Sequence, residues 1–474
     1  MWNRHDLPSP ANICQLLKIE KGDKMIKTDV LIVGGSAAGI VAAVTAKSNY
    51  PDAEVTVIRK EKEVLVPCGI PYIFGSLESS QQNIIPDANL DNAGVKILVD
   101  EVISVDYENR TCKPAAGEVI SFDKLVFATG STPKVPEWLK GANLENVFTV
   151  PKNKIIIDEL SRKLINSNKI VVVGGGFIGV EISDELNKAH KDVTIVEMLP
   201  HVLAAVFDDE AAKKAEEILK SRGVKVKTGS GIKEIAGQGK ASAVILQNGE
   251  EIEADVVILS MGYVPNTDLA KSSGVSINEF GQIKVDEFMR TDKPNVFAIG
   301  DCAGKRDFIT RRKSCTMLAS TACTEARIVG MNLFKLSTLK TFKGTIALFS
   351  TVIGESVFGV AGITFREASK QNIDAFSARF EGPDKHPGKL PGMQMQSVEL
   401  VIAKNSGLLL GGTVIGGISA GELVNAIGLA IQNAMTVYDL LTAQIGTHPL
   451  LTASPIAYPL IKAAEVAVKK IREL

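Results

Sequence analysis

Short apolar runs recur along the chain, and two of them lead through glycines into helical patterns. The run DVLIVGG at 29–35 enters the alanine-rich segment SAAGIVAAVTAKS, and a second apolar run, EVTVIRK, follows at 54–60. The same order returns at 169–197, where KIVVVGGG leads into a helical pattern and the run DVTIVE closes the unit. Strand, glycine turn, helix and strand in this order predict two βαβ units.

The rest of the chain divides into buried strands and a C-terminal region of different character. Three further apolar runs predict strands that end in turns: 123–136, 254–269 and 295–304. From about Thr341 the pattern changes to alternating strands with an Asn-Ser-Gly turn, followed by amphipathic helices expected around 420–440 and 455–473. The pattern predicts an α/β protein with two Rossmann-like domains and a separate C-terminal α+β domain.

Composition narrows the class of protein. A chain of 474 residues exceeds the size of one hydrophobic core, so several domains are expected. Fifty-three basic and 54 acidic residues leave a net charge of −1, which steers the chain toward neither nucleic acid nor an anionic membrane. No apolar run is long enough to span a bilayer. Residues 1–24 lack the apolar centre and cleavage site of a secretory signal, and we interpret them as an N-terminal extension.

The cysteines show neither a CxxC pair nor metal-ligand spacing. We therefore expect no metal site, and cysteine usage of this kind indicates a reducing, cytoplasmic location. The six are Cys14, Cys68, Cys112, Cys302, Cys315 and Cys323.

The second βαβ unit carries an unbroken G-x-G-x-x-G. Gly174 makes the tight turn, Gly176 lets a pyrophosphate approach the backbone, and Gly179 lets the helix pack on the strand. Glu197 ends the next strand, where a carboxylate accepts from a ribose diol and repels a 2′-phosphate. The unit therefore predicts a site that prefers NADH to NADPH.

The first unit is less regular. Its loop reads Gly34-Gly35-Ser36-Ala37-Ala38-Gly39, with serine at the middle glycine position, and its second strand ends in Arg59-Lys60-Glu61 where an acid is expected. Either Glu61 substitutes for that acid or Arg59 contacts the adenosine in another way. Gly300-Asp301 adds a further element, because a carboxylate at a strand end either binds a ribityl hydroxyl or caps a helix. Because the chain also contains two nucleotide-binding loops, we favour a ligand-binding role for Asp301 over a helix cap.

Four stretches together carry a resemblance to a known family: VLIVGGSAAG, LVFATGSTPKVP, VVVGGGFIGVE with TIVEMLP, and NVFAIGDCA. From about Lys27 to its C-terminus the chain resembles the FAD-dependent pyridine nucleotide-disulfide oxidoreductases, the glutathione-reductase-like enzymes. The resemblance implies an FAD domain formed by 25–150 and 272–340, an inserted NAD domain at 151–271, and a dimerisation domain at 341–474. That last domain is expected to form a homodimer and to contribute to the partner's active site.

The resemblance also implies the residues that bind the two cofactors. Glu181, in GVE, matches a glutamate expected near the nicotinamide. The full expected set is Gly34, Gly35, Ser36, Ala37, Ala38, Gly39, Arg59, Lys60, Pro67, Val102, Ala128, Thr129, Gly130, Asp301, Leu318, Ala319, Thr321, Gly174, Gly176, Phe177, Ile178, Gly179, Glu181, Glu197 and Gly262.

Cys68, in VLVPCGIPYIFG, is the expected redox residue. The position five before it is Glu63, so the C-x4-C disulfide of glutathione-reductase-like members cannot form. The stretch PCGIPYIFG instead resembles the single-cysteine branch, which contains coenzyme A-disulfide reductase, persulfide and sulfur reductases, NADH oxidase and NADH peroxidase. Pro71 suits a first helical turn, so we expect a helix to start at Cys68 or Gly69 and its dipole to favour the thiolate.

Three positions bear on which single-cysteine enzyme this is. Peroxidase- and oxidase-like members of the family carry a histidine at the position in the first loop where this chain has Ala37. The resemblance therefore argues against peroxide chemistry. Lys47 is the one basic residue that the first helix offers to the phosphates of CoA. His448, before Pro449, resembles the acid/base histidine that glutathione-reductase-like members send across the dimer, with Tyr458 a weaker candidate.

The leading hypothesis is an FAD-dependent NADH oxidoreductase that reduces a disulfide, persulfide or polysulfide through Cys68, with CoA disulfide the best-named substrate. The partners expected are therefore a small thiol-derived substrate and a second copy of the chain. The alternative is an NADH oxidase that reduces oxygen to peroxide or water. A third hypothesis, an electron-transfer reductase for a protein carrier, ranks last.

Overall fold

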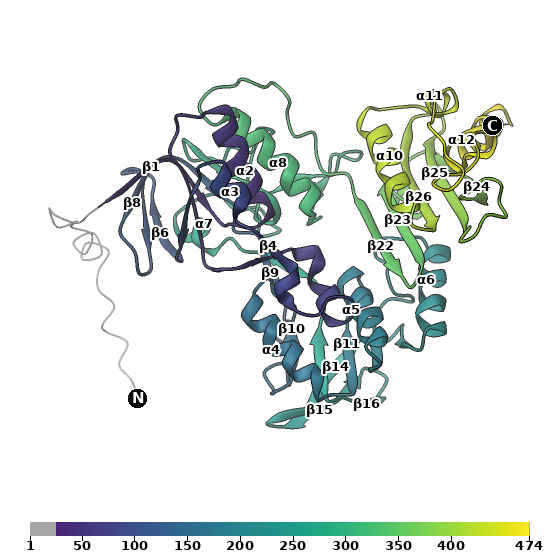
Figure 1. Cartoon of the computed structure of the whole chain (residues 1–474), viewed down its shortest axis with the longest axis horizontal. Coiled ribbons are helices and arrows are strands. Elements are labelled where there is room, and N and C mark those ends of the chain that lie inside the picture. Colours follow the sequence, from purple (N-terminus) through teal and green to yellow (C-terminus); the bar gives the residue numbers. More distant parts are fainter. Residues whose placement is uncertain (1–24, 474) are drawn as a thin grey trace.

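The computed structural model describes residues 25–473, so the predicted extension 1–24 and Cys14 lie outside the described residues. The chain forms one unit built on a mixed sheet, a second built on a parallel sheet and inserted within the first, and a C-terminal antiparallel unit (Figure 1). No helix between residues 25 and 473 combines the length and the apolar character that a membrane crossing requires.

The first unit is built around a seven-stranded sheet of order β5-β2-β1-β8-β7-β6, with β19 also pairing with β8. Because β19 follows β8 only after the whole second unit, two separated segments of the chain complete this sheet. Its strands are β1 (Ile26–Val33), β2 (Val55–Arg59), β5 (Lys96–Val99), β6 (Val102–Asp106), β7 (Thr111–Pro114), β8 (Ile120–Phe127) and β19 (Val296–Ala298). Its helices are α2 (Ala37–Asn49), α3 (Ala88–Asn92), α7 (Asp268–Ser272) and α8 (Ala319–Asn332).

The second unit holds a five-stranded parallel sheet of order β10-β17-β11-β12-β13. It begins with β10, so it starts a few residues before the predicted boundary at 151. Its strands are β10 (Val147–Thr149), β11 (Lys169–Val173), β12 (Asp192–Val196), β13 (Lys225–Lys227) and β17 (Val256–Leu259), with an antiparallel sheet of β14 (Ile232–Gln238), β15 (Lys240–Leu246) and β16 (Glu251–Glu253). Its helices are α4 (Lys154–Ile165), α5 (Phe177–Lys188) and α6 (Asp209–Ser221).

The remaining elements of the first two units are short. They are β3 (Val64–Leu65) paired with β4 (Ile84–Ile85), β9 (Ser131–Pro133) paired with β18 (Tyr263–Pro265), β20 (Lys305–Arg306) paired with β21 (Lys313–Ser314), and the 3₁₀ segments η1 (Pro67–Phe74), η2 (Ser80–Asn83) and η3 (Gly300–Cys302).

The third unit is an antiparallel sheet of order β22-β23-β26-β25-β24 with helices packed against it. In Figure 1, β22 extends away from this unit toward α6 of the second one. The helical stretch expected around 420–440 is two helices, because the chain leaves the helix after Gln432. The elements are β22 (Leu348–Ile353), β23 (Ser356–Gly362), β24 (Ala375–Pro383), β25 (Met395–Ala403), β26 (Leu409–Gly416), α9 (Phe365–Lys370), α10 (Ala420–Gln432), α11 (Val437–Leu441), η4 (Pro455–Ala457) and α12 (Pro459–Glu473).

The two glycine turns have nearly the same geometry. Gly34 has φ +114° and Gly174 has φ +113°, values that favour glycine. A Cβ added at Gly39 would lie 1.9 Å from the Gly34 carbonyl oxygen, and one added at Gly179 would lie 1.9 Å from the Gly174 carbonyl oxygen. The third glycine of each loop is therefore required by contact between helix and turn.

The middle position of each loop differs from the third. A Cβ added at Gly176 would meet no heavy atom of the described chain within 4 Å. Its backbone (φ −75°, ψ −175°) matches that of Ser36 in the first unit (φ −94°, ψ −162°). Serine therefore fits the fold at the middle position of the loop, and the space beside this position is open to a ligand.

Substitutions at Gly179 and Gly176 should distinguish a glycine that is required for packing from one that leaves space for a ligand. Gly179→Ala should lower the free energy of unfolding by about 1–3 kcal/mol, because the added methyl overlaps the Gly174 carbonyl. Gly176→Ser should change it by less than about 0.5 kcal/mol, because serine is a good N-cap residue in this conformation. Urea denaturation of the two variants tests this, and equal losses of stability would contradict it.

Candidate active site

A cavity of about 650 Å³ lies where the three units meet. The two glycine loops, η1, the end of β19 with η3, the start of α8, and β22 all contribute to its wall. Residues that line it are Ser36, Ala37, Ala38, Pro67, Cys68, Ile70, Pro71, Ala128, Gly130, Ser131, Val150, Lys152, Gly176, Phe177, Ile178, Glu181, Ser260, Gly262, Tyr263, Ile299, Gly300, Asp301, Met317, Leu318, Ala319, Ser320, Ala322, Leu348, Phe349 and Ser350.

Three helices begin at this cavity without a side-chain cap. No cap hydrogen bond from a side chain forms at Ser36 before α2, at Gly176 before α5 or at Leu318 before α8, and no acid lies in the first turn of any of the three. Their first N–H groups are thus left for a ligand, and three positive helix ends favour an anionic one. A Cβ added at Gly130 or Gly262 would also meet open space, so a ligand can approach the backbone there.

The cavity brings together most of the predicted cofactor residues. Those that line it are Ser36, Ala37, Ala38, Pro67, Ala128, Gly130, Asp301, Leu318, Ala319, Gly176, Phe177, Ile178, Glu181 and Gly262, together with Cys68. Those that do not line it are Gly34, Gly35, Gly39, Arg59, Lys60, Val102, Thr129, Thr321, Gly174, Gly179 and Glu197.

The predicted residues outside the cavity have structural contacts of their own. Val102 belongs to the core of the first unit. Thr129 Oγ1 donates to the Asn266 carbonyl (2.6 Å), and Thr321 Oγ1 lies 2.7 Å from that of Thr345. Glu197 accepts hydrogen bonds from the backbone N–H groups of Gly175 (2.6 Å) and Leu199 (2.8 Å), so its carboxylate is fixed behind the second loop.

Arg59 occupies the place in the first unit that Glu197 holds in the second. Its side chain is buried and packs under Gly35, just as Glu197 packs under Gly175. The guanidinium forms two hydrogen bonds of 2.7 Å to the carboxylate of Asp87. A carboxylate is therefore present beside the first loop, although it comes from the start of α3 and not from the end of β2. Lys60 pairs with Glu101 on the surface.

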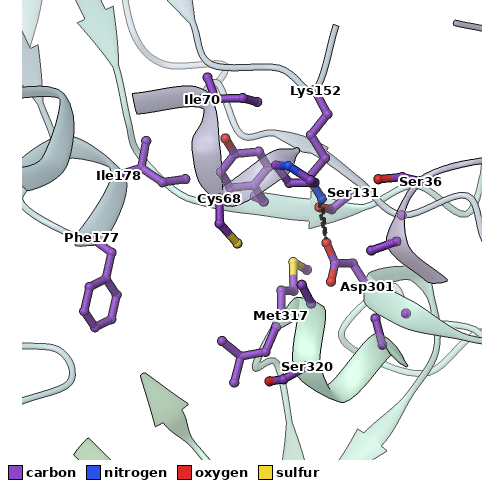
Figure 2. Close-up of a pocket in the computed structure, with 18 of the residues that line it drawn as sticks. Ser36, Cys68, Ile70, Ser131, Lys152, Phe177, Ile178, Asp301, Met317 and Ser320 are labelled. Atoms are coloured by element: carbon purple, nitrogen blue, oxygen red, sulfur yellow. Dashed lines mark hydrogen bonds and ion pairs between the residues drawn. The ribbon is translucent and has the colours of Figure 1, made fainter. Parts of the chain in front are cut away.

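Cys68 lies on η1, and in Figure 2 its sulfur points into the space toward Met317. The proline that starts this 3₁₀ segment is Pro67, whereas Pro71 lies inside it, so the predicted position of Pro71 in the first turn is wrong. Burial and the carboxylate of Glu181 raise the pKa of the Cys68 thiol, and Lys152 opposes them. The helix dipole is expected to lower the pKa of Cys68, but in the single chain the raising effects of burial and Glu181 are larger.

Lys152 and Ser131 are the main site residues that the sequence analysis missed. Lys152 forms an ion pair with Asp301 (2.8 Å), and both Lys152 Nζ and Asp301 lie within hydrogen-bond distance of the Ser131 hydroxyl (Figure 2). Burial alone would raise the pKa of Asp301, but these two partners lower it below its usual value. Lys152 follows β10 with no recognisable motif, so no local signal marked it.

Glu181 links the second unit to the third. Its carboxylate accepts a hydrogen bond from Thr351 of β22 (2.8 Å), and Phe349 of the same strand stacks on Phe177 with ring centroids 5.1 Å apart. Burial raises the pKa of Glu181 to about 7, even though the Thr351 hydrogen bond lowers it. This carboxyl therefore changes its charge near neutral pH.

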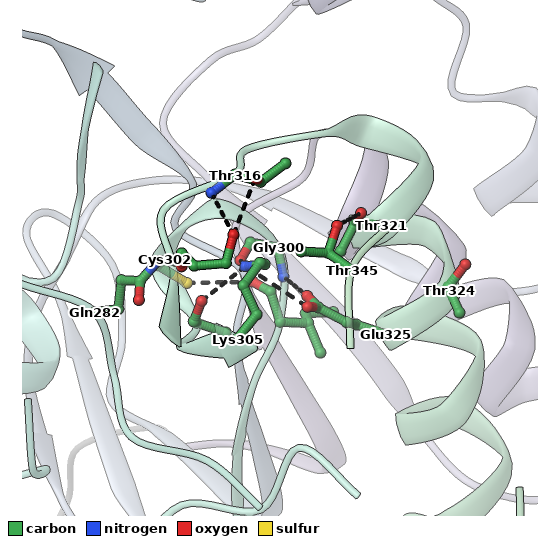
Figure 3. A network of polar contacts seen from close by, with 12 residues as sticks. Gln282, Gly300, Cys302, Lys305, Thr316, Thr321, Thr324, Glu325 and Thr345 are labelled. Carbon is green, nitrogen blue, oxygen red and sulfur yellow. Dashed lines mark hydrogen bonds and ion pairs between the residues drawn. The ribbon is translucent and has the colours of Figure 1, made fainter. Parts of the chain in front are cut away.

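A buried charge pair supports the Gly300-Asp301 turn (Figure 3). The Gly300 N–H donates to Glu325 (2.7 Å), and Lys305 Nζ donates to the carbonyls of Gly300 (2.9 Å) and Ala303 (2.7 Å). Lys305 and Glu325 are almost completely buried and lie 3.6 Å apart. Burial raises the pKa of Glu325 to about 7 against the opposing effect of Lys305.

His448 is exposed and does not line the cavity of its own chain. Its Nδ1 accepts from the Leu450 N–H (3.3 Å). Tyr458 packs against the core of the third unit, also outside the cavity. No histidine of the described chain lines the cavity, and residues 25–473 contain no group of three His, Cys, Asp or Glu side chains placed to hold a metal. An acid/base role for His448 stays a prediction that depends on a second copy of the chain.

Two dinucleotide-type units that face one thiol across a shared cavity define a dinucleotide-dependent oxidoreductase. Comparison with known families gives the same result. Residues 28–326 match the model of the pyridine nucleotide-disulphide oxidoreductases, and residues 349–456 match the dimerisation domain of that family. The chain belongs to the pyridine nucleotide-disulphide oxidoreductase family, which confirms the predicted family and fold class.

Individual relatives include both kinds of enzyme that the sequence analysis considered. An NADH oxidase of Enterococcus faecalis is 31% identical over 432 residues, which cover 89% of this chain and 95% of the relative. An NAD(P)H coenzyme A polysulfide/persulfide reductase of Pyrococcus horikoshii is 33% identical over 402 residues, covering 83% and 88%.

The solved structures that resemble this chain include the same two kinds of enzyme. An NAD-dependent persulfide reductase from A. fulgidus superposes with a TM-score of 0.87 at 28% identity, over 94% of this chain and 84% of that one. A water-forming NADH oxidase from Lactobacillus brevis, solved with NADH, has a TM-score of 0.86 at 25% identity, over 94% and 99%. The chain is an oxidoreductase, and the predicted cofactors, FAD and NADH, agree with its family and with these relatives.

The buried carboxyl of Glu325 should give the stability of the protein a distinct pH dependence. Its folded-state pKa, about 7, lies above its ordinary value of 4.5, so the stability it contributes is present at low pH and is lost as pH rises through this window. Glu325→Gln should remove that fall. The difference in the free energy of unfolding between variant and wild type should change by roughly 3 kcal/mol between pH 4.5 and 7.

Urea denaturation at several pH values measures this difference. Glu217→Gln, on the exposed face of α6, is the matched control and should follow the wild-type curve. Parallel curves for wild type and Glu325→Gln would contradict the assignment.

Proposed function

We propose that the protein is an FAD-containing, NADH-dependent reductase of a thiol-derived disulfide, persulfide or polysulfide, with CoA disulfide as its best-named substrate, and that it acts as a homodimer. The observation that carries this proposal is Cys68, whose sulfur enters a cavity bordered by both dinucleotide loops. The coenzyme A-dependent and persulfide-reducing relatives support the same substrate class.

The residues present fit both cofactors. The open backbone at Gly130 and the uncapped starts of α2 and α8 suit the phosphates and carbonyl oxygens of FAD, and Asp301 suits a ribityl hydroxyl. On the other side of the cavity, the loop at Gly174–Gly179 and the fixed carboxylate of Glu197 suit NADH, because that carboxylate would repel a 2′-phosphate. When bound, the flavin supplies a two-electron carrier between NADH and the sulfur of Cys68.

The protein's own residues then handle the sulfur chemistry. The Cys68 thiolate attacks the substrate disulfide, forms a mixed disulfide and releases one thiolate, and two electrons later restore the Cys68 thiolate and release the second. Lys152 provides the positive charge that opposes the raised pKa of Cys68. In the proposed homodimer, His448 of one copy or water protonates the leaving thiolate.

The cavity chemistry favours sulfur over oxygen as the electron acceptor. Ala37 lines the cavity where a histidine would be expected for peroxide or oxygen chemistry, and no other histidine of the described chain replaces it. Oxygen reduction to peroxide or water therefore remains the alternative function, represented by the NADH oxidase relatives.

Cys68→Ser tests the proposal. It should reduce disulfide or persulfide turnover by at least about 1,000-fold, because a hydroxyl does not exchange with disulfides, while NADH still bleaches the bound flavin. Stopped-flow absorbance follows the bleaching, and steady-state NADH consumption with CoA disulfide follows the turnover.

Cys323→Ser, one turn into α8, is the matched control and should keep wild-type turnover. Persistent disulfide turnover in Cys68→Ser would contradict the proposal. Oxygen uptake by the wild type at a rate equal to its best disulfide rate would favour the oxidase.

A further inference from the structure

Among the described residues, the cavity lining offers no unpaired cation to a phosphorylated substrate. Lys152 is the one lysine or arginine of residues 25–473 that lines it, and Lys152 forms an ion pair with Asp301 (2.8 Å). Lys47, the predicted CoA contact on α2, donates to the Ala53 carbonyl (2.8 Å) and does not line the cavity. If a thiol with phosphates binds here, its phosphates must be held by another part of the chain.

The hairpin β20–β21 and its loop, which lie between the cavity-lining residues Asp301 and Met317 in the sequence, present a group of basic side chains. Arg306, Arg311, Arg312 and Lys313 are all exposed. Lys313 pairs with Glu279, but no carboxylate in residues 25–473 lies within ion-pair distance of the three arginines. In a chain of net charge −1, such a group concentrates positive potential locally.

The frame that holds these arginines is rigid. Asp307 Oδ1 accepts from the Thr310 N–H (2.7 Å) and hydroxyl (2.8 Å), and the Arg312 carbonyl accepts from the Asp307 N–H (2.8 Å). Phe308 and Ile309 pack against the core of the third unit. The apolar side of the loop is thus buried, and the basic side chains remain on its outer side.

Both ends of the hairpin are tied to the active site. Lys305 of β20 is the buried lysine that supports the Gly300-Asp301 turn (Figure 3). After β21, the chain reaches Met317, which lines the cavity with Cys68 (Figure 2). Arg312 is five residues from Met317, so their Cα atoms are at most about 18 Å apart. A long flexible arm can join a thiol at Cys68 to phosphates at the hairpin.

We propose that Arg306, Arg311 and Arg312 form an anchoring site for the phosphates of a nucleotide-bearing thiol substrate, a thiol on a long arm that ends in a phosphorylated adenosine. Guanidinium groups suit this ligand because they hold phosphate oxygens through two parallel hydrogen bonds. The proposal rests on the proposed function, since it assumes that the thiol end of the same molecule reacts at Cys68. In this role, the hairpin would select phosphorylated disulfides over disulfides that lack phosphates.

Two substrates with the same reactive arm separate the two claims. CoA disulfide carries the phosphates, and pantethine is the corresponding disulfide without them. In the full-length holoenzyme, Arg311→Gln/Arg312→Gln should lower kcat/KM for CoA disulfide at least about tenfold, mainly through KM, and leave pantethine within about twofold of wild type. Wild-type kcat/KM for CoA disulfide should also fall with added salt, and that dependence should weaken in the variant.

Lys213→Gln/Lys214→Gln, on the exposed face of α6, removes the same charge away from the hairpin and should change neither substrate. Arg312→Glu is a second variant, because the Arg312 side chain forms no hydrogen bond to the described residues and its loss should not disturb the loop. Equal losses for both substrates, or unchanged use of CoA disulfide in both hairpin variants, would overturn the proposal. Equal use of the two substrates by the wild type would also overturn it and leave the proposed function intact.

Calorimetry with adenosine 3′,5′-bisphosphate provides a reading that does not depend on turnover. Binding by the wild type and its loss in Arg311→Gln/Arg312→Gln support the anchoring site even if the protein reduces neither disulfide, in which case only the proposed function fails. Binding that is equal in wild type and variant would overturn the anchoring site.

Discussion

The structure depends on the close approach of strand, turn and helix at the two glycine loops. At each loop the third glycine lies so near the first that a Cβ would overlap a carbonyl oxygen, and the helix can therefore start directly over the end of the strand. This approach directs the first N–H groups of α2 and α5 at one cavity from two different domains. The middle position of each loop differs, because a Cβ added at Gly176 would meet no heavy atom of the described chain and Ser36 has a similar backbone conformation.

The third unit completes the cavity. Its strand β22 contributes Leu348, Phe349 and Ser350 to the lining, and Thr351 on the same strand holds the carboxyl of Glu181. Arg222 of the second unit joins the same region, because its partner Asp184 also accepts from the Gly354 N–H at the turn after β22. The pKa of Glu181, about 7, therefore depends on Thr351 of the third unit as well as on burial and Glu185 of the second.

The sequence predicted those features that have a local signal. Strand, glycine turn and helix appear within about 30 residues, so both loops, the Gly300-Asp301 turn and Cys68 could be found by their spacing. Features that arise from contact between distant segments could not. Lys152 meets Asp301 across 149 residues, and Asp87 supplies Arg59 with a carboxylate from a different element. The basic loop 306–312 also needed the structure, because only packing of Phe308 and Ile309 shows which of its sides is exposed. Pro71 was misplaced because two prolines flank Cys68, and pattern alone could not tell which one starts the helix.

The proposed activity requires that Cys68 exchange directly with a substrate disulfide. Intact-mass measurement with peptide mapping under non-reducing conditions tests this exchange, after one equivalent of CoA disulfide has reacted, without NADH, with holoenzyme whose flavin is oxidised and whose Cys68 is a free thiol. Direct exchange should give one CoA adduct per chain, located on Cys68, with release of one free CoA thiol. An unmodified Cys68 peptide, with CoA disulfide nevertheless consumed, would contradict it.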